Sequence, residues 1–143
     1  MNKKGPVVVI EDDEDDRLML SDIFKKLPYG NEVVFFENGN AALDYLNQTE
    51  VKPFLILSDI NMPMINGFEL RNKIHASEQL HLKCIPYLFF TTTSNKQAVM
   101  DAYMLSVQGF FVKPQSYAKL EDTIRKIMEY WMECIAPNEF EEK

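Results

Sequence analysis

The stretch that decides the fold is Phe54-Leu55-Ile56-Leu57, followed by Ser58-Asp59-Ile60-Asn61-Met62-Pro63-Met64-Ile65-Asn66-Gly67. The first four residues form an apolar run typical of a buried strand, and Pro63 and Gly67 indicate a sharp turn directly after it. The pattern therefore places the carboxylate of Asp59 at the carboxyl end of a strand. In an open α/β sheet, ligands and reacting groups gather at this edge. A single aspartate there is more often a turn or cap residue, so the other strand ends decide its meaning.

Three further apolar runs also end in polar side chains: Glu11 and Asp12 after Val7–Ile10, Thr91 after residues 87–90, and Lys113 after residues 110–112. Acidic, hydroxyl and amine side chains are thus all expected at the carboxyl ends of strands. Because the carboxyl ends of parallel strands meet at the same edge of a sheet, we expect these side chains to share one crevice.

Five short apolar runs alternate with helical patterns along the chain, which indicates an α/β fold with a parallel sheet and helices on both faces. The expected strands are residues 7–10, 33–36, 54–57, 85–90 and 110–112. The expected helices are residues 15–27, 39–46, 67–77, 95–106 and 116–134. Right-handed crossovers arrange such units as a doubly wound sheet, although the pattern alone leaves the strand order open. Residues 76–83 are expected to form a surface elaboration.

The length of 143 residues fits one domain with its own core, for which we expect residues 1–136. Residues 137–143 are expected to be a short acidic tail, too short to form an output domain. The apolar runs are too short to cross a membrane, and no secretory leader is expected at the start. We therefore expect a cytoplasmic protein with two reduced cysteines, Cys84 and Cys134. The net charge of −7 argues against direct binding of nucleic acid.

Together these motifs resemble the receiver domain of two-component response regulators, over about residues 6–131. The shared pattern is an acidic pair after the first strand, Asp-x-x-Met-Pro-x-x-x-Gly after the third, Thr after the fourth and Lys-Pro after the fifth. The resemblance implies a five-stranded, flavodoxin-like sheet of order 2-1-3-4-5. It also implies a stand-alone signalling switch that is not an enzyme beyond its own self-phosphorylation and self-dephosphorylation.

The resemblance gives the acidic residues specific roles. Asp59 would be the phosphoacceptor, charged by a histidine kinase or histidine phosphotransfer protein. Asp12 and Asp59 would bind Mg²⁺ directly, with the backbone carbonyl of Asn61 as a third ligand and Glu11 acting through water. The residue types agree with this, because three close carboxylates repel unless they share protons or hold a cation, and oxygen ligands suit Mg²⁺.

The resemblance also implies a switch made by Thr91, Lys113 and Phe110. Lys113 and Thr91 would contact the phosphoryl group, and Phe110 would fill the space that Thr91 leaves, which changes the 95–112 surface for an unknown protein target. A cis bond is expected at Lys113–Pro114. Asn61 and Thr93 lie at positions that tune self-dephosphorylation in the family.

Two other readings remain at this stage. A degenerate receiver would act as a binding module that never takes phosphate, although Asp59, Thr91 and Lys113 are all retained. A haloacid-dehalogenase-like phosphatase would need an aspartate two residues after its nucleophile, where this chain has Asn61. The last helix carries more apolar residues than one face needs, including Trp131, which indicates core packing or a surface for a homodimer or another partner.

Overall fold

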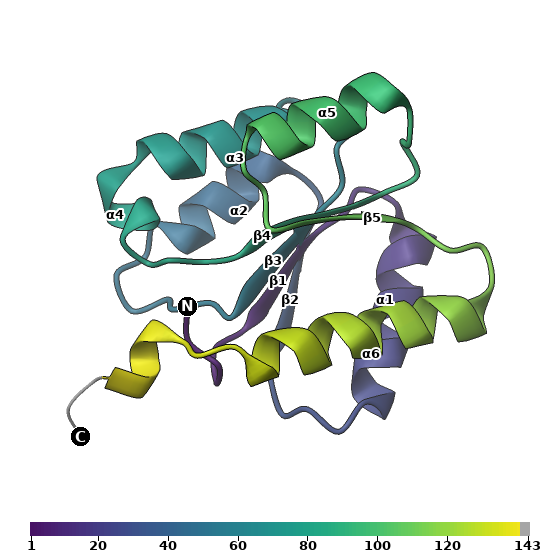
Figure 1. Cartoon of the computed structure of the whole chain (residues 1–143), viewed down its shortest axis with the longest axis horizontal. Helices are drawn as coiled ribbons and strands as arrows, with labels where there is room; N and C mark the ends of the chain where they lie inside the picture. Colours follow the sequence, from purple (N-terminus) through teal and green to yellow (C-terminus); the bar gives the residue numbers. More distant parts are fainter. Residues whose placement is uncertain (141–143) are drawn as a thin grey trace.

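The structure, a computed structural model, describes residues 1–140, and Figure 1 shows its arrangement. The strands within this range are β1 (Val7–Ile10), β2 (Val33–Phe36), β3 (Leu55–Ser58), β4 (Tyr87–Thr91) and β5 (Gly109–Val112). The helices are α1 (Glu14–Lys26), α2 (Gly39–Leu46), α3 (Gly67–Ala76), α4 (Glu78–His81), α5 (Lys96–Met104) and α6 (Tyr117–Glu133), with a 3-10 helix at Pro137–Phe140.

The strands form one parallel sheet in the order β2-β1-β3-β4-β5, which confirms the expected flavodoxin-like topology. Helices α1 and α6 cover one face, and α2, α3 and α5 cover the other (Figure 1). Every connection from one parallel strand to the next therefore carries a helix back across the sheet, and the carboxyl ends of all strands lie at one edge.

Two apolar cores lie on either side of the sheet. Along β1, Val7 and Val9 pack against the α1 and α6 side, while Val8 and Ile10 pack against the α2 and α3 side. All four side chains are almost fully buried. Because helices cover both faces, the central strands consist of continuous apolar runs rather than alternating ones, which is why they could be located from sequence.

Helix boundaries differ from the expected ones by one or two residues, and caps explain the difference. The Asp13 side chain accepts a hydrogen bond from the Asp16 amide, so α1 begins at Glu14 instead of residue 15. The Ser116 side chain accepts from the Lys119 amide in the same way, so α6 begins one residue later than expected. The segment 76–83, expected as a surface elaboration, contains the short helix α4, whose Leu80 is buried in the core beside α3.

No helix within residues 1–140 is long and apolar enough to cross a bilayer. The tail expected at residues 137–143 continues as the 3-10 helix to Phe140, and its last three residues lie outside the described part of the chain.

Candidate functional site

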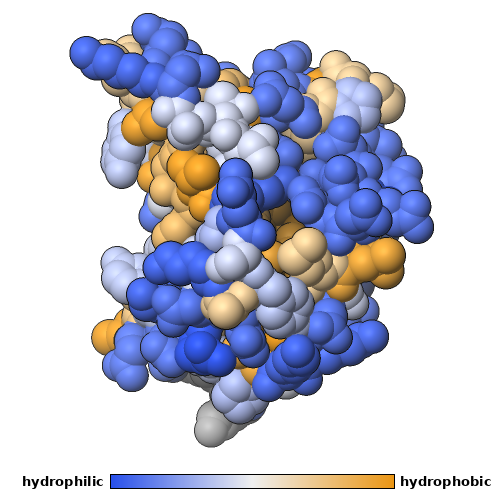
Figure 2. Space-filling model, turned by 90° about the vertical axis from the view of Figure 1, so that its right-hand side faces the viewer, coloured by the Kyte–Doolittle hydropathy of each residue, from blue (hydrophilic) through white to orange (hydrophobic). Residues whose placement is uncertain are grey.

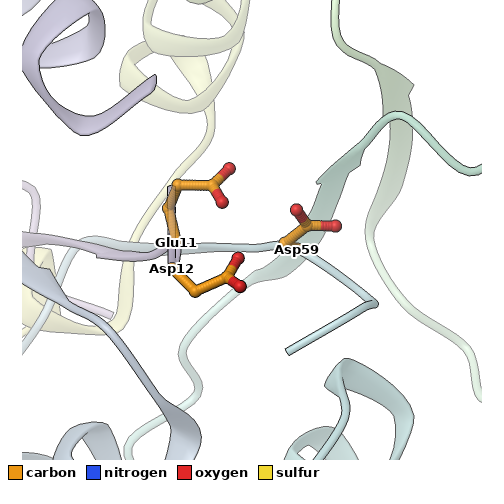
Figure 3. Close-up of side chains that lie close together, drawn as sticks. All are labelled: Glu11, Asp12 and Asp59. Atoms are coloured by element: carbon orange, nitrogen blue, oxygen red, sulfur yellow. The ribbon is translucent and has the colours of Figure 1, made fainter. Parts of the chain in front are cut away.

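The carboxylates of Glu11, Asp12 and Asp59 form an acidic cluster at the carboxyl edge of the sheet. One oxygen of each lies within 4.8 Å of the others. The carboxylates of Glu11 and Asp12 extend toward Asp59 (Figure 3). Glu11 and Asp59 are buried, whereas Asp12 is exposed, so the cluster opens to solvent on one side. Figure 2 looks onto this side of the molecule, where hydrophilic surface predominates around a central hollow.

Strand pairing brings the three acids together. In the parallel register of β1 and β3, Ile10 lies opposite Ser58, so the residues that follow each strand leave the sheet at the same level. The Asp59 amide donates to the Ile10 carbonyl at 3.1 Å, which extends the ladder by one step. The spacing of the acids therefore follows from the sheet itself and not from a flexible loop.

Lys113 supplies the positive charge of the site. Its ammonium donates to Oδ2 of Asp59 and to Oδ2 of Asp16, each at 3.1 Å, and also to Oε1 of Glu11. Its amide donates to the Thr91 carbonyl at 2.9 Å, which ties the end of β5 to the end of β4. All three ammonium protons thus have a carboxylate acceptor.

The other Asp59 oxygen, Oδ1, accepts two hydrogen bonds. The Thr91 hydroxyl donates to it at 2.6 Å, and the amide of Ile60 donates at 2.7 Å. Thr91 is fully buried at the end of β4. The carboxylate of Asp59 is therefore held in one orientation, between a hydroxyl on one oxygen and an ammonium on the other.

The turn after Asp59 depends on Gly67. A Cβ atom on Gly67 would lie 2.4 Å from the Asp59 carbonyl oxygen and 2.7 Å from a ring carbon of Phe89, closer than real contacts allow. The Gly67 amide donates to the Ile60 carbonyl at 2.8 Å and closes the turn. Asn66 then caps α3 through a capping box with Glu69. Only glycine lets the chain return this close behind the site.

Burial and charge oppose each other inside the site. Burial raises the pKa of the Glu11 carboxyl to about 7, although the Lys113 ammonium acts in the opposite direction. Burial alone would lower the pKa of Lys113, but the hydrogen bond and charge of Glu11 outweigh it and hold that pKa above its usual value. An excess of negative charge thus surrounds one ammonium group, which favours an additional cation.

The remaining expected site residues lie around this centre. The Asn61 side chain donates to the Thr93 hydroxyl, so the exposed Asn61 and the half-buried Thr93 meet at the mouth of the site. Phe110 is half-buried against the α2 and α3 core, opposite Phe89 in the β4–β5 register, and the two ring centroids are 6.1 Å apart. The metal-ligand role expected of the Asn61 carbonyl, and the switch and dephosphorylation roles expected of these residues, stay predictions.

One sequence expectation about this region is wrong. The Lys113–Pro114 bond is trans, and residues 1–140 contain no cis peptide bond. An X-Pro bond prefers trans unless the surroundings favour the cis form, and the Lys113 ammonium reaches all three carboxylates with the bond in trans.

Two residues of the site were missed from sequence. Asp16 was interpreted only as an acidic residue of a helix start, yet its carboxylate contacts Lys113. Arg17 donates to the Glu11 carbonyl at 2.8 Å and pairs with Glu37 at 3.3 Å. Their position in the sequence could have indicated this role, because a helix that begins directly after a strand places its first residues near the carboxyl edge of the sheet.

Comparisons with known proteins identify the family of the chain. The model of the response regulator receiver domain family matches residues 7–125. The probable methanogenesis regulatory protein FilR2 of Methanothrix harundinacea is 29% identical over 130 residues, which cover 88% of this chain and 83% of FilR2. Response regulator Rcp1 of Synechocystis is 27% identical over 139 residues, which cover 94% and 93% of the two chains.

Solved structures show the same fold. The phosphorylated cyanobacterial phytochrome response regulator RcpA superposes with a TM-score of 0.82 at 26% identity, over 92% of this chain and 96% of RcpA. The Mn(2+)-bound form of Rcp1 superposes with a TM-score of 0.81 at 26% identity, over 92% and 97% of the two chains.

Proposed function

Because the chain belongs to the family of response regulator receiver domains, we propose that it is a Mg²⁺-dependent signalling switch whose phosphoacceptor is Asp59. The observation that carries the proposal is the pair of hydrogen bonds to this carboxylate. The Lys113 ammonium donates to one oxygen and the Thr91 hydroxyl donates to the other. The proposed donor is a histidine kinase or a histidine phosphotransfer protein in the cytoplasm, and the proposed output is contact with a protein target.

The acidic cluster fits a divalent cation of the size and hardness of Mg²⁺. Three carboxylate oxygens lie within 4.8 Å of one another, and the exposed Asp12 leaves room for the waters that Mg²⁺ retains. Asp12 and Asp59 would hold the ion directly, with the Asn61 carbonyl, and Glu11 through water. When bound, the ion supplies positive charge that neutralises the oxygens of a transferring phosphoryl group. The Mn(2+)-bound structure of Rcp1, which has the same fold, supports the binding of a divalent metal.

In the proposed step, a carboxylate oxygen of Asp59 attacks the phosphorus of a phosphohistidine. The P–O bond forms as the P–N bond breaks, and the electron pair of the broken bond stays with the imidazole. The reacting form is the one protonated at the other ring nitrogen, so that the histidine leaves as a neutral imidazole. Lys113 lies 3.1 Å from Asp59 and is placed to donate to a phosphoryl oxygen.

The proposed switch begins at Thr91. Its hydroxyl now donates to Asp59, and a phosphoryl group on that carboxylate offers stronger acceptors further out. Thr91 would follow them, and the loop after β4 would move with it. The ring of Phe110, which already packs near Phe89, would fill the vacated space, and the 95–112 surface would change for a partner.

The test is the intact mass of the protein after incubation with acetyl phosphate, with and without Mg²⁺. We expect a gain of one phosphoryl group in wild type with Mg²⁺, and no gain in Asp59→Asn. The matched control is Asp44→Asn, which makes the same change at an exposed carboxylate on α2 and should retain the gain.

A gain in Asp59→Asn equal to that of wild type would overturn Asp59 as the acceptor. A gain that does not depend on Mg²⁺ would overturn the metal requirement. No gain in any sample, from correctly folded protein, would favour the degenerate receiver that binds partners without phosphate.

A further inference from the structure

A second hollow lies at the opposite, amino edge of the sheet. It is a cavity of about 490 Å³ where the chain enters β4 and β5, and we call it the amino-edge cavity. Helices α3 and α4 contribute one side of it, and the end of α6 contributes the other. These segments gather at the left of Figure 1, away from the carboxyl ends of the strands. The volume is in the range of small-molecule sites in proteins.

The charge of the amino-edge cavity is opposite to that of the chain as a whole. The chain has 22 acidic and 15 basic residues, yet none of the described residues that line the cavity is acidic. Its lining includes the guanidinium of Arg71 and the imidazoles of His75 and His81. An acidic protein therefore presents a hollow that has basic side chains and no carboxylate among its described lining residues.

Arg71 has no counter-ion in the described part of the chain. It is half-buried on α3, and no hydrogen bond or ion pair involves its guanidinium among residues 1–140. Burial lowers its pKa, and no carboxylate contributes to that shift. A guanidinium presents donors in a planar fork that matches a carboxylate or a sulfonate, and a partly desolvated one is costly unless such a group meets it.

The remaining lining is mostly apolar, with a few placed donors. Trp131, Ile85 and Leu80 contribute apolar wall. The Gln108 side-chain oxygen accepts from the Tyr87 amide at 2.8 Å, which leaves the amide nitrogen of Gln108 as a donor. A mostly apolar hollow with a few convergent polar groups is the usual form of a ligand site.

We propose that the amino-edge cavity binds a small amphipathic anion. Its carboxylate or sulfonate would pair with Arg71, and its aromatic or aliphatic body would lie against Trp131. Charge complementarity and the concave shape and volume of the hollow favour a compact ligand over a flat protein partner. The site is separate from the acidic cluster and does not depend on phosphorylation.

The chain provides its own reporter, because Trp131 is its only tryptophan. The probe is 8-anilinonaphthalene-1-sulfonate, an aromatic body with one sulfonate. We expect saturable binding, seen as a fall in Trp131 emission with energy transfer to the probe. Probe bound at the carboxyl edge beside Lys113 would be distinguished from this by its response to the variants below.

Arg71→Gln should weaken probe binding roughly tenfold to hundredfold, the range for loss of a hydrogen-bonded charge. The matched control is Lys73→Gln, which removes one positive charge from the same helix but does not line the cavity. It should bind the probe as wild type does. The uncharged analogue N-phenyl-1-naphthylamine should show no difference between wild type and Arg71→Gln.

A second variant protects the test against misfolding. Ile135 lines the rim and is 72% exposed, so Ile135→Glu adds a repelling carboxylate with little risk to the core. This variant should also weaken binding of the anionic probe, while its circular dichroism spectrum and melting temperature remain those of wild type.

Three results would overturn the proposal. One is equal probe affinity in wild type and Arg71→Gln, and another is binding without any change in Trp131 emission. The third is displacement of the probe by the peptide Glu-Phe-Glu-Glu, which copies residues 139–142, but not by decanoate. That result would assign the cavity to an acidic chain segment instead of a small ligand.

Discussion

The two edges of the sheet each hold a partly buried basic side chain, and the surroundings of these two cations differ. At the carboxyl edge, the Lys113 ammonium contacts the carboxylates of Glu11, Asp16 and Asp59. At the amino edge, the Arg71 guanidinium contacts no carboxylate among residues 1–140. Lys113 thus has three carboxylate partners, whereas Arg71 has none within the described residues. The first cation should therefore matter for stability and the second for binding.

Lys113→Ala should show the largest effect on stability. It leaves Glu11 and Asp59, only 3% and 8% exposed, without their cation. Removing one partner of a buried ion pair costs about 3 kcal/mol, and we expect a loss of this size in the free energy of unfolding from urea denaturation without metal. Lys119→Ala is the control, because its pair with Asp122 is exposed and contributes little. Equal losses in both variants would contradict the role of Lys113.

Gly67→Ala should come next, because the carboxyl edge is closely packed behind the site. The added methyl would lie 2.4 Å from a backbone oxygen, and we expect a loss of about 2 kcal/mol in the free energy of unfolding. Gly30→Ala, in the loop that leads into β2, is the control, since a Cβ there meets nothing within 4 Å. If Gly30→Ala proved the more destabilising of the two in thermal or urea unfolding, the comparison between the edges would fail.

Tyr87→Phe tests the residue that lies between the two edges. Its ring lines the amino-edge cavity, and its buried hydroxyl donates to the Gly67 carbonyl at 3.1 Å. Removing the hydroxyl leaves that carbonyl without the bond and should cost about 1 to 2 kcal/mol in urea denaturation. Tyr45→Phe is matched to it, because the Tyr45 hydroxyl has no hydrogen bond among the described residues. If Tyr87→Phe had the same free energy of unfolding as wild type, the hydrogen bond from Tyr87 to the Gly67 carbonyl would not contribute to stability.

Arg71→Gln should have the smallest effect on stability. Since no ion pair is broken, we expect the free energy of unfolding to stay within about 0.5 kcal/mol of wild type. The measurement is the same urea titration used for Lys113→Ala. A loss as large as that of Lys113→Ala would mean that Arg71 is a structural cation, and the contrast between the edges would disappear.

Much of the fold could be predicted from sequence because the sheet is buried on both faces. Residues 7–10 and 33–36 were placed with correct limits, since apolar runs of this length between polar segments have one dominant reading. The short helix α4 was missed, because four residues carry too little periodicity to separate a helical turn from a loop.

The site could be predicted where it follows strand ends and not elsewhere. Glu11, Asp59 and Lys113 directly follow a strand, Asp12 comes one residue after Glu11, and Thr91 is the last residue of β4. The parallel sheet alone therefore brings these residues to one edge. Asp16 lies inside a helix, and its contact with Lys113 depends on the rotation of α1 relative to β5. The amino-edge cavity is assembled from segments far apart in sequence, from the first residue of the chain to the 3-10 helix, and no local pattern encodes it.

Lys83 is another partly buried basic side chain at the amino edge, and backbone carbonyls rather than carboxylates surround its ammonium. Its ammonium donates to the carbonyls of Leu46, Gln48 and Val51, at 2.6, 3.0 and 2.9 Å, where α2 ends. The segment after α4 is thereby attached to the loop before β3, although more than thirty residues separate them. In hydrogen exchange, the amides of these two surface segments should open together as one cooperative unit, at a rate that acetylation of this one lysine would increase.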